Sequence, residues 1–232
     1  MKNFYADCRT CSMKGCSMLK HCTEEWLTLI NDKKICMYAR QGQQIIHEGT
    51  PATGIYFVHS GKVKIYKSGL NERNFILKLG KEGDIIGHCG FGKNYLYSSS
   101  ASALEDAHLC FIENSIFLDL LKDCHPLTYE LMLYYGEELH TYETRMINLV
   151  QMNVREKVAD TLLLLRDSYG EDSQDNSLNV ALSRQDLAEI SGTTKEQVSK
   201  ILTEFDSEKI IQTSGKKISI LNNQKLLKEL SY

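Results

Sequence analysis

The chain of 232 residues carries 27 Lys and Arg against 30 Asp and Glu, which gives a formal net charge of −3. This balance argues against indiscriminate binding to nucleic acid, although it leaves room for a local basic face. The first residues, MKNFYADCRTC, lack the apolar segment of a secretory signal, and no apolar run reaches membrane-spanning length. We therefore expect a cytoplasmic protein without membrane contact, whose eight cysteines are thiols or metal ligands rather than structural disulfides.

The chain begins with a cysteine-rich lead. Cys8, Cys11, Cys16 and Cys22 are separated by intervals of two, four and five residues. A short helix is expected to close this lead, from Glu24 to Asn31.

Residues 35 to 112 read as a series of short strands. Segments rich in β-branched and aromatic residues alternate with turns that contain glycine, such as Ser60-Gly61. Short strands at this spacing predict a barrel or jelly roll. The expected strands are Ile35 to Tyr38, Gln44 to His47, Ile55 to Val58, Lys62 to Lys67, Phe75 to Leu79, Asp84 to Ile86, Leu96 to Ser102 and His108 to Ile112.

Residues 115 to 167 are predicted to be helical, and they carry an apolar heptad pattern. A second apolar face of the same helix, with Leu127, Leu131 and Tyr134, can pack on the roll. Two apolar faces on one helix favour a homodimer, although the heptad face could instead pack within its own chain. The heptad positions are Met132, Tyr135, Leu139, Tyr142, Met146 and Leu149.

Residues Leu182 to Leu202 have the pattern of a helix-turn-helix. Ser183 can cap a first helix together with Asp186, and Gly192 suits the tight turn that follows. A second helix then presents polar side chains that can reach bases and phosphates in a DNA major groove. The alternative is an ordinary helical hairpin with a solvated outer face.

A hairpin follows the two helices. The segments 210–213 and 217–221 flank Ser214-Gly215-Lys216 and are expected to form a wing.

The order of elements predicts four parts: a cysteine-rich lead (1–23), a β-roll effector domain (24–124), a dimerisation helix (125–152) and a winged helix-turn-helix domain (153–232). The fold class is α+β.

Several motifs in this order resemble the family of the cyclic-AMP receptor protein and the fumarate–nitrate reduction regulator (CRP/FNR). GIYFV at 54–58, SGKVKIY at 60–66 and GDIIG at 83–87 are similar to the family's cyclic-nucleotide-binding roll. NVREKVA at 153–159, SRQDLA at 183–188 and TKEQVSK at 194–200 are similar to its DNA-binding domain. The resemblance implies a homodimeric transcription regulator that binds an inverted repeat in double-stranded DNA, with RNA polymerase as a further partner if it activates.

The resemblance also implies roles on the second helix. In the fumarate–nitrate branch a Glu, a Ser and an Arg read bases, and the matching residues here are Glu196, Ser199 and Lys200. The Lys departs from the pattern, and a capping bond to the Thr193 backbone is the alternative role for Glu196. The expected phosphate contacts come from Arg184, Thr194, Lys195, Lys216 and Lys217.

The ligand pocket departs from the family pattern. Cyclic-AMP binders carry a Glu after the glycine that matches Gly87, and an Arg further along that holds the phosphate. Here His88 follows Gly87, the later stretch offers only hydroxyls such as Ser99 and Ser100, and no Arg or Lys lies between residues 93 and 122. Burying a phosphate against hydroxyls alone is unfavourable. We therefore expect a degenerate effector pocket that does not bind cyclic AMP.

The cysteines leave several chemistries open. A related regulator holds a [4Fe–4S] cluster with three N-terminal cysteines and a distant fourth, which Cys110 matches here. The N-terminal intervals differ from that regulator's spacing of two and five. A cluster, a zinc site, reversible thiol oxidation and plain reduced thiols all remain readings of Cys8, Cys11, Cys16, Cys22 and Cys110.

Two other classes of function are compatible with parts of the sequence or can be tested against it. The helix-turn-helix could contact a protein rather than DNA, which the salt dependence of DNA binding would reveal. An enzyme is disfavoured because the sequence has no nucleophile–base pair, glycine-rich phosphate loop or HExxH motif.

Overall fold

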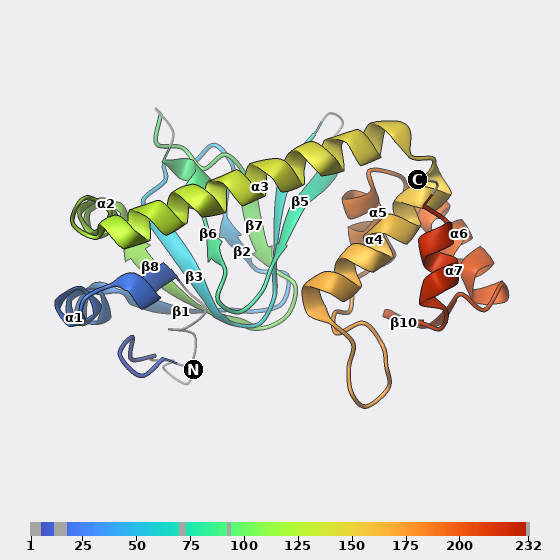
Figure 1. The fold of residues 1–232 in the computed structure, drawn as a ribbon, viewed down its shortest axis with the longest axis horizontal. Coiled ribbons are helices and arrows are strands. Elements are labelled where there is room, and N and C mark those ends of the chain that lie inside the picture. The colour runs from blue at the N-terminus through green and yellow to red at the C-terminus, as the bar shows by residue number, and fades with distance from the viewer. Residues whose placement is uncertain (1–5, 12–17, 70–72, 92–93, 231–232) are drawn as a thin grey trace. The chain divides into compact units, whose positions relative to one another are not determined.

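The computed structural model describes residues 6–11, 18–69, 73–91 and 94–230. The chain divides into two compact units, one made of residues 1–69 and 77–140 and the other of residues 70–76 and 141–232 (Figure 1).

In the first unit, the 3-10 turn η2 (Met18–His21) precedes the helix α1 (Glu24–Lys33). The Thr23 hydroxyl caps α1 by accepting a hydrogen bond from the Trp26 backbone N–H at 3.3 Å. Leu27 and Ile30 bury one face of this helix.

Eight strands form the roll, and each corresponds to one that the sequence predicts. They are β1 (Ile35–Ala39), β2 (Gln44–Ile46), β3 (Gly54–Ser60), β4 (Val63–Ser68), β5 (Asn74–Gly80), β6 (Ile85–Ile86), β7 (Ser100–Ala103) and β8 (Ala107–Glu113). They build two four-stranded sheets, in the orders β1-β8-β3-β6 and β2-β7-β4-β5. The strand expected from Leu96 begins only at Ser100, because Tyr97 instead exchanges backbone hydrogen bonds with Gly49 and Thr50.

The two faces of the first sheet bury two different cores. Along β3, Tyr56 and Val58 point into the roll, whereas Ile55 and Phe57 point to the opposite face. That opposite face is covered by α1, by α2 (Asn114–Asp123) and by the first turns of α3 (His125–Gln151), which supply Leu27, Phe117, Leu120, Leu127 and Leu131. Cys110 on β8 packs against this second core.

The region expected to be helical from 115 to 167 is three helices. Cys124, with φ −104° and ψ 78°, separates α2 from α3. Asn153 starts α4 (Val154–Tyr169) with a capping box in which Glu156 is the reciprocal partner.

The second unit continues with α5 (Arg184–Ser191), α6 (Lys195–Ser207), the antiparallel hairpin of β9 (Ile211–Ser214) and β10 (Lys217–Ile220), and α7 (Asn223–Lys228). Its core gathers Leu162, Leu187, Val198, Leu202 and Phe205, all nearly inaccessible to solvent. The helix α7 was not expected from the sequence. Asn222 caps it, and Leu226 anchors it in the core.

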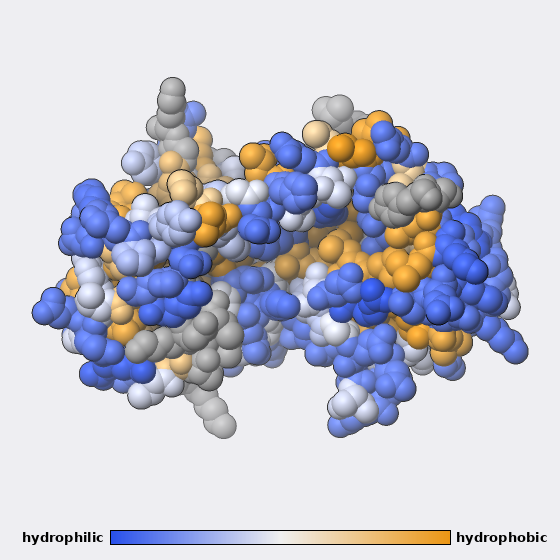
Figure 2. Space-filling model, viewed as in Figure 1, coloured by the Kyte–Doolittle hydropathy of each residue, from blue (hydrophilic) through white to orange (hydrophobic). Residues whose placement is uncertain are grey.

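Within the described part of the chain, no helix combines the length and hydropathy that crossing a bilayer requires. Hydrophilic side chains cover most of the face seen in Figure 2, and apolar side chains interrupt it.

Candidate nucleic-acid interface and sensory sites

The helix-turn-helix has the capping that its sequence predicts. The Ser183 hydroxyl accepts a hydrogen bond from the Asp186 backbone N–H at 3.0 Å, and the Asp186 carboxylate accepts one from the Ser183 N–H at 3.1 Å. Helix α5 ends at Gly192, which has the left-handed φ of 61° that glycine tolerates best. The turn thereby fixes where α6 begins.

Helix α6 starts from Thr194, whose hydroxyl accepts a hydrogen bond from the Gln197 backbone N–H at 3.3 Å. Gln197 completes this capping box, so the reciprocal capping role lies with Gln197 and not with Glu196. Val198, Leu202 and Phe205 hold the inner face of α6 in the core.

The outer face of α6 carries the expected base-reading residues. Lys195, Glu196 and Lys200 are exposed, and Ser199 is half-buried and donates to the Lys195 carbonyl at 2.8 Å. A hydrogen bond from its own backbone N–H and another from the Thr194 hydroxyl lower the pKa of Glu196, which keeps it ionised. These four residues recur at helical spacing and occupy one side of α6.

Two adjacent lysines of the wing lie in different environments. Lys216 is exposed in the turn next to Gly215, which has φ 61°. Lys217 forms an ion pair with Asp175 at 2.5 Å, which raises the pKa of the lysine. Arg184 is half-buried, and burial lowers its pKa. Because Asp175 neutralises Lys217, Lys216 is the wing lysine better placed to contact an anionic partner.

Helix α3 presents a band of exposed apolar residues. Met132, Leu139 and Met146 of the expected seam are 59%, 60% and 62% exposed, and Tyr135 is 36% exposed. Tyr142 and Leu149 are half-buried. The band extends further round the helix than the heptad pattern indicates, through Tyr129, Leu133, Ile147 and Val150.

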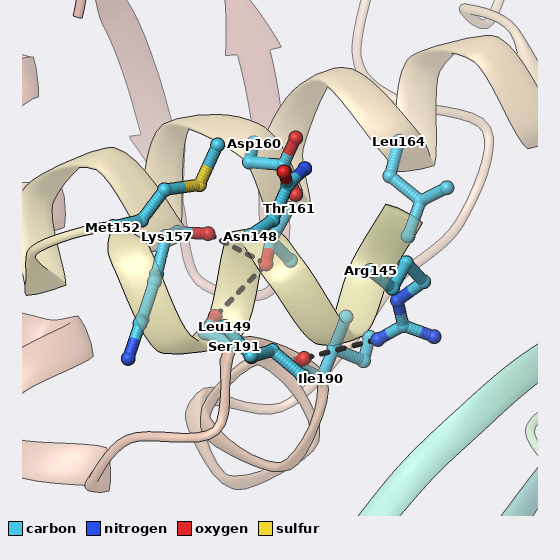
Figure 3. A pocket seen from close by; sticks show the side chains of 10 residues that line it. All are labelled: Arg145, Asn148, Leu149, Met152, Lys157, Asp160, Thr161, Leu164, Ile190 and Ser191. Carbon is cyan, nitrogen blue, oxygen red and sulfur yellow. Dashed lines mark hydrogen bonds between the residues drawn. The ribbon is translucent and has the colours of Figure 1, made fainter. Parts of the chain in front are cut away.

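Leu149 contributes to a small pocket among helices of the second unit (Figure 3). Arg145 donates to the Ile190 carbonyl there at 3.2 Å, and the Thr161 and Ser191 hydroxyls lie 3.0 Å apart. Arg145 thus joins α3 to α5, the Thr161–Ser191 contact joins α4 to α5, and Leu149 lines the same pocket.

The residues of the expected effector pocket contact other groups of the protein. Gly87 has φ 83°, and a Cβ there would lie 3.0 Å from the Tyr97 ring. The Ser100 hydroxyl accepts a hydrogen bond from the Glu48 backbone N–H at 3.0 Å, whereas Ser99 is half-buried. Tyr56 and Tyr97 are both buried in the roll interior.

His88 lies in the 3-10 turn η4 (His88–Gly90) and is 5% exposed. Its Nε2 lies 2.7 Å from Oε2 of Glu138 on α3, and the Lys78 ammonium donates to Oε1 of the same carboxylate at 2.7 Å. Lys78 also bonds the Tyr134 hydroxyl, and the Tyr135 hydroxyl donates to the His88 carbonyl at 2.9 Å. Lys78 and Glu138 are site residues that the sequence analysis missed.

This group of side chains is charged. Burial opposes the charged form of His88, but the neighbouring Cys89 sulfur and the hydrogen bond to Glu138 outweigh it and raise the pKa of His88 to about 9. Burial likewise opposes ionisation of Glu138, yet the His88 hydrogen bond and the Lys78 charge lower the pKa of Glu138 to about 2. The Glu138 carboxylate therefore already neutralises part of the charge of His88 and Lys78.

Three of the expected cysteines meet in one place. Cys8, Cys11 and Cys110 line a cavity of about 40 Å³ together with Lys34 and His59. Cys11 Sγ lies 3.5 Å from Nδ1 of His59, and the Cys8 backbone N–H donates to the Asn31 side chain at 3.0 Å. Cys22 packs against the second core, the one covered by α1, α2 and α3, but does not line this cavity, and Cys16 lies outside the described residues.

Cys36 joins this cysteine cluster, which sequence reasoning missed. It stands directly opposite Cys110 in the β1–β8 pairing. Burial, reinforced by neighbouring Cys36, raises the pKa of Cys110 to about 12, and burial also raises the pKa of Cys8. A cysteine in each of two expected strands was the available signal, but only the register brings the two together.

Both parts of this chain are similar to known proteins. Residues 37–124 match the model of the cyclic nucleotide-binding domain, and residues 156–229 match the Crp-like helix-turn-helix domain. The anaerobic regulatory protein of Bacillus subtilis is 28% identical over 74% of this chain and 74% of its own length. That of Aggregatibacter actinomycetemcomitans is 26% identical over 97% of this chain and 87% of its own length.

The structure of FixK2 from Bradyrhizobium japonicum has the same fold, with a TM-score of 0.75, 24% identity and coverage of 86% of this chain and 98% of that one. A cyclic-nucleotide-binding roll, a long helix and a Crp-like helix-turn-helix thus follow one another in the expected order. The chain belongs to the CRP/FNR family of transcription regulators, which are DNA-binding proteins and not enzymes.

Proposed function

We propose that this regulator is a homodimer that binds an inverted repeat in double-stranded DNA through α6 and recruits or blocks RNA polymerase there, in the cytoplasm. The observation that carries the proposal is the outer face of α6, where Lys195, Glu196 and Lys200 are exposed at the start of a capped helix. Exposed cationic and hydrogen-bonding side chains at the N-terminal end of such a helix can reach base edges and phosphates together.

The apolar band of α3 supports the dimer. Met132, Leu139 and Met146 recur every seven residues and are each more than half exposed. Large apolar side chains on one helix face gain stability when a second copy covers them. Two copies related by a two-fold axis would present two α6 helices to half-sites about one helical turn apart.

Selection of bound duplexes from a random pool, followed by titration of the selected sequence, tests this function. An inverted repeat should emerge, and its affinity should fall steeply with salt, as expected for several phosphate contacts. Recovery of no preferred sequence, together with weak binding to every duplex, would favour the alternative that the helix-turn-helix contacts a protein.

Cyclic AMP is not part of the proposed function. Glu138 places a carboxylate against both His88 and Lys78, so a cyclic phosphate would have to compete with it for these cations. Titration calorimetry with cyclic AMP should give no heat of binding, and the DNA affinity should be unchanged by millimolar nucleotide. Saturable binding would contradict this part of the proposal.

A thiol-based redox signal is the second function that a specific observation favours. Cys8 and Cys11 of the lead lie in one cavity with Cys110, and Cys36 stands opposite Cys110. Thiolates are the ligands that iron–sulfur clusters require, and these four cysteines provide enough donors for one. Such a cluster would supply an oxygen-labile centre that ties the lead to the roll. Relatives named anaerobic regulatory proteins support a signal of this kind.

Anaerobic reconstitution with iron and sulfide tests the redox proposal. A broad visible absorbance that is lost in air, and that Cys110→Ser abolishes, would support a cluster. If the wild-type protein takes up no iron, and Cys8→Ser and Cys110→Ser leave DNA binding insensitive to oxidant, both the cluster and the thiol signal are excluded.

A further inference from the structure

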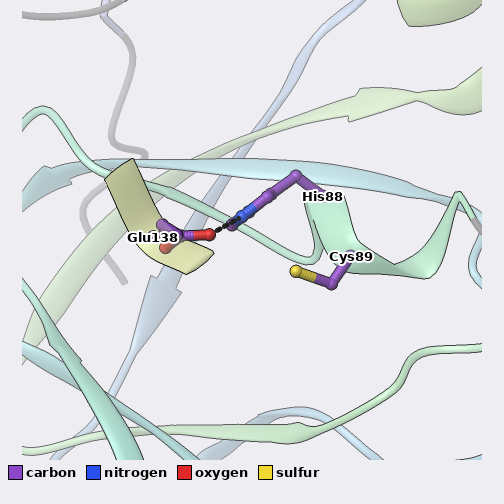
Figure 4. Close-up of side chains that lie close together, drawn as sticks. All are labelled: His88, Cys89 and Glu138. Carbon is purple, nitrogen blue, oxygen red and sulfur yellow. Dashed lines mark hydrogen bonds and ion pairs between the residues drawn. The ribbon is translucent and has the colours of Figure 1, made fainter. Parts of the chain in front are cut away.

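Three side chains with different donor atoms converge beside η4 (Figure 4). A ligand atom each from His88, Cys89 and Glu138 lies within 4.8 Å of the other two, and no other trio of His, Cys, Asp or Glu within the described ranges of the chain does so. An imidazole nitrogen, a thiol sulfur and a carboxylate oxygen together form a donor set typical of zinc and similar transition metals.

The buried member of this group, His88, has a ring nitrogen without a hydrogen-bond partner. His88 is 5% exposed, and its Nδ1 has no hydrogen-bond partner. A buried nitrogen without a partner is unfavourable in a folded protein and calls for an explanation. An ion bound at Nε2, the nitrogen that faces Glu138, would hold the neutral ring in the tautomer that keeps its proton on Nδ1, without itself contacting that nitrogen.

The exposed member of this group, Cys89, gives a metal ion access from solvent. Cys89 is exposed, so an ion can arrive from solvent at the thiol and keep a water molecule as its fourth ligand. Glu138 is held from the other side, because Lys78 bonds its second oxygen at 2.7 Å. A carboxylate oriented by a second hydrogen bond is the arrangement that metal-binding carboxylates usually have.

We propose that His88, Cys89 and Glu138 bind a divalent transition metal ion, with zinc as the best match. In a tetrahedral zinc site, nitrogen and oxygen ligands lie roughly 3.3 Å apart, given bond lengths of about 2.0 Å. The 2.7 Å contact between His88 and Glu138 therefore opens by less than about 1 Å when the ion enters. No change of fold is needed.

On binding, the metal ion replaces one hydrogen bond and two protons of the ligand side chains. The bonds that form are from the metal to an imidazole nitrogen, to the Cys89 sulfur and to a Glu138 oxygen. The hydrogen bond between His88 and Glu138 breaks, and the displaced N–H and S–H protons pass to the buffer. No oxidant or reductant takes part.

Cobalt(II) is the probe, because it occupies zinc sites and reports its ligands by absorbance. The full-length protein, reduced and freed of metal, is titrated with Co²⁺ beside the variants Cys89→Ser, Glu138→Gln and, as the matched control, Cys124→Ser. Cys124 is a buried cysteine of the second core and is not one of the proposed ligands. Wild type and Cys124→Ser should show tetrahedral cobalt bands with a thiolate charge-transfer band, and zinc should displace them.

Cys89→Ser should lose one bound ion per chain together with the part of the charge-transfer band that this ion contributes, and Glu138→Gln should bind that ion at least tenfold more weakly. Equal cobalt binding by wild type and Cys89→Ser would overturn the proposal, and so would an equal loss in Cys124→Ser. Circular dichroism of each variant shows whether it is folded. Because the readout is metal binding, it stands or falls independently of DNA recognition.

Discussion

Arg155 at the start of α4 donates two hydrogen bonds to Glu229, which lies 74 residues further along the chain, at 2.7 Å and 3.0 Å. The same guanidinium donates to Glu204 at 3.1 Å and to Glu208 at 2.7 Å, and it lies over the Phe205 ring at 4.5 Å. One side chain thus joins α4, α6 and the end of α7. These contacts raise the pKa of Arg155 and lower the pKa of Glu229.

Arg155→Met should destabilise the second unit by about 2 kcal/mol, because three carboxylates then face one another without their shared cation. Urea unfolding followed by circular dichroism measures this change. Arg166→Met is the control, because its nearest acidic partner, Asp167, is adjacent in sequence and mostly exposed, and it should cost less than about 1 kcal/mol. A similar loss in both variants would contradict the bridging role of Arg155.

The same contacts predict a dependence on acid. The pKa of Glu229 is lower in the folded than in the unfolded protein, so its contribution is fully present above the unfolded value of 4.5 and is lost as the pH falls below it. Wild type should therefore lose more unfolding free energy between pH 5 and pH 3 than Glu229→Gln does. Parallel curves for the two proteins would exclude Glu229 as the source.

Much of the fold could be predicted from local sequence. Short segments, many of them rich in β-branched and aromatic residues, and the glycine-containing turns between several of them indicated the strands of the roll, and Ser183 with Gly192 indicated both ends of α5. These signals operate within a few residues, so no knowledge of the tertiary structure is needed to read them. The helix α7 escaped prediction because its six residues are too short to show a helical period.

The charged group formed by Lys78, His88 and Glu138 could not be predicted, because these residues are distant in sequence. Lys78, His88 and Glu138 meet only when β5, η4 and α3 are placed in space. Lys78 precedes Gly87, whereas the family pattern places its phosphate-binding cation after the matching glycine, so the motif gave no reason to consider Lys78. Cys36 was missed for a similar reason, since the strand register that pairs it with Cys110 is not visible in the spacing of the N-terminal cysteines.

Glu196→Ala tests base reading. Because Gln197 rather than Glu196 completes the capping box of α6, the substitution should leave the stability of the protein within about 0.5 kcal/mol. It should relax preference at one position of each half-site, with a loss of discrimination of about 1–3 kcal/mol. Competition binding with single-base variants of the selected site measures this, and an unchanged ranking of sites would exclude base reading by Glu196.

Lys216 and Lys217 provide a matched pair on the wing. Lys216→Ala should weaken binding to all duplexes by a similar factor and reduce the salt slope by about one unit. Lys217→Ala should have the smaller effect, because Asp175 already neutralises that lysine at 2.5 Å. Fluorescence anisotropy at several salt concentrations gives both slopes. A larger effect of Lys217→Ala would mean that the ion pair with Asp175 opens on DNA.

Gly54→Ala tests the close pairing of β3 and β8. A Cβ at Gly54 would lie 2.2 Å from the Ile112 carbonyl oxygen and 2.5 Å from the Phe111 ring. The strands must separate to admit it, so a loss of roughly 2–3 kcal/mol in unfolding free energy is expected. Gly136→Ala in α3 is the control. Nothing lies within 4 Å of its added Cβ, and alanine favours a helix over glycine by about 1 kcal/mol.

Met146→Glu tests the dimer. Met146 is 62% exposed in the single chain, so a charge there should be harmless to the fold of one copy. In a dimer sealed along α3 it would be buried opposite its symmetry mate, at a cost of roughly 3 kcal/mol or more. Sedimentation equilibrium should show a monomer that has lost tight binding to the inverted repeat. Thr144→Glu introduces the same charge at an exposed position of α3 outside the expected seam, and it should remain dimeric. A dimeric Met146→Glu protein would move the interface away from this face of the helix, because no seam of packed methionines tolerates two unpaired carboxylates.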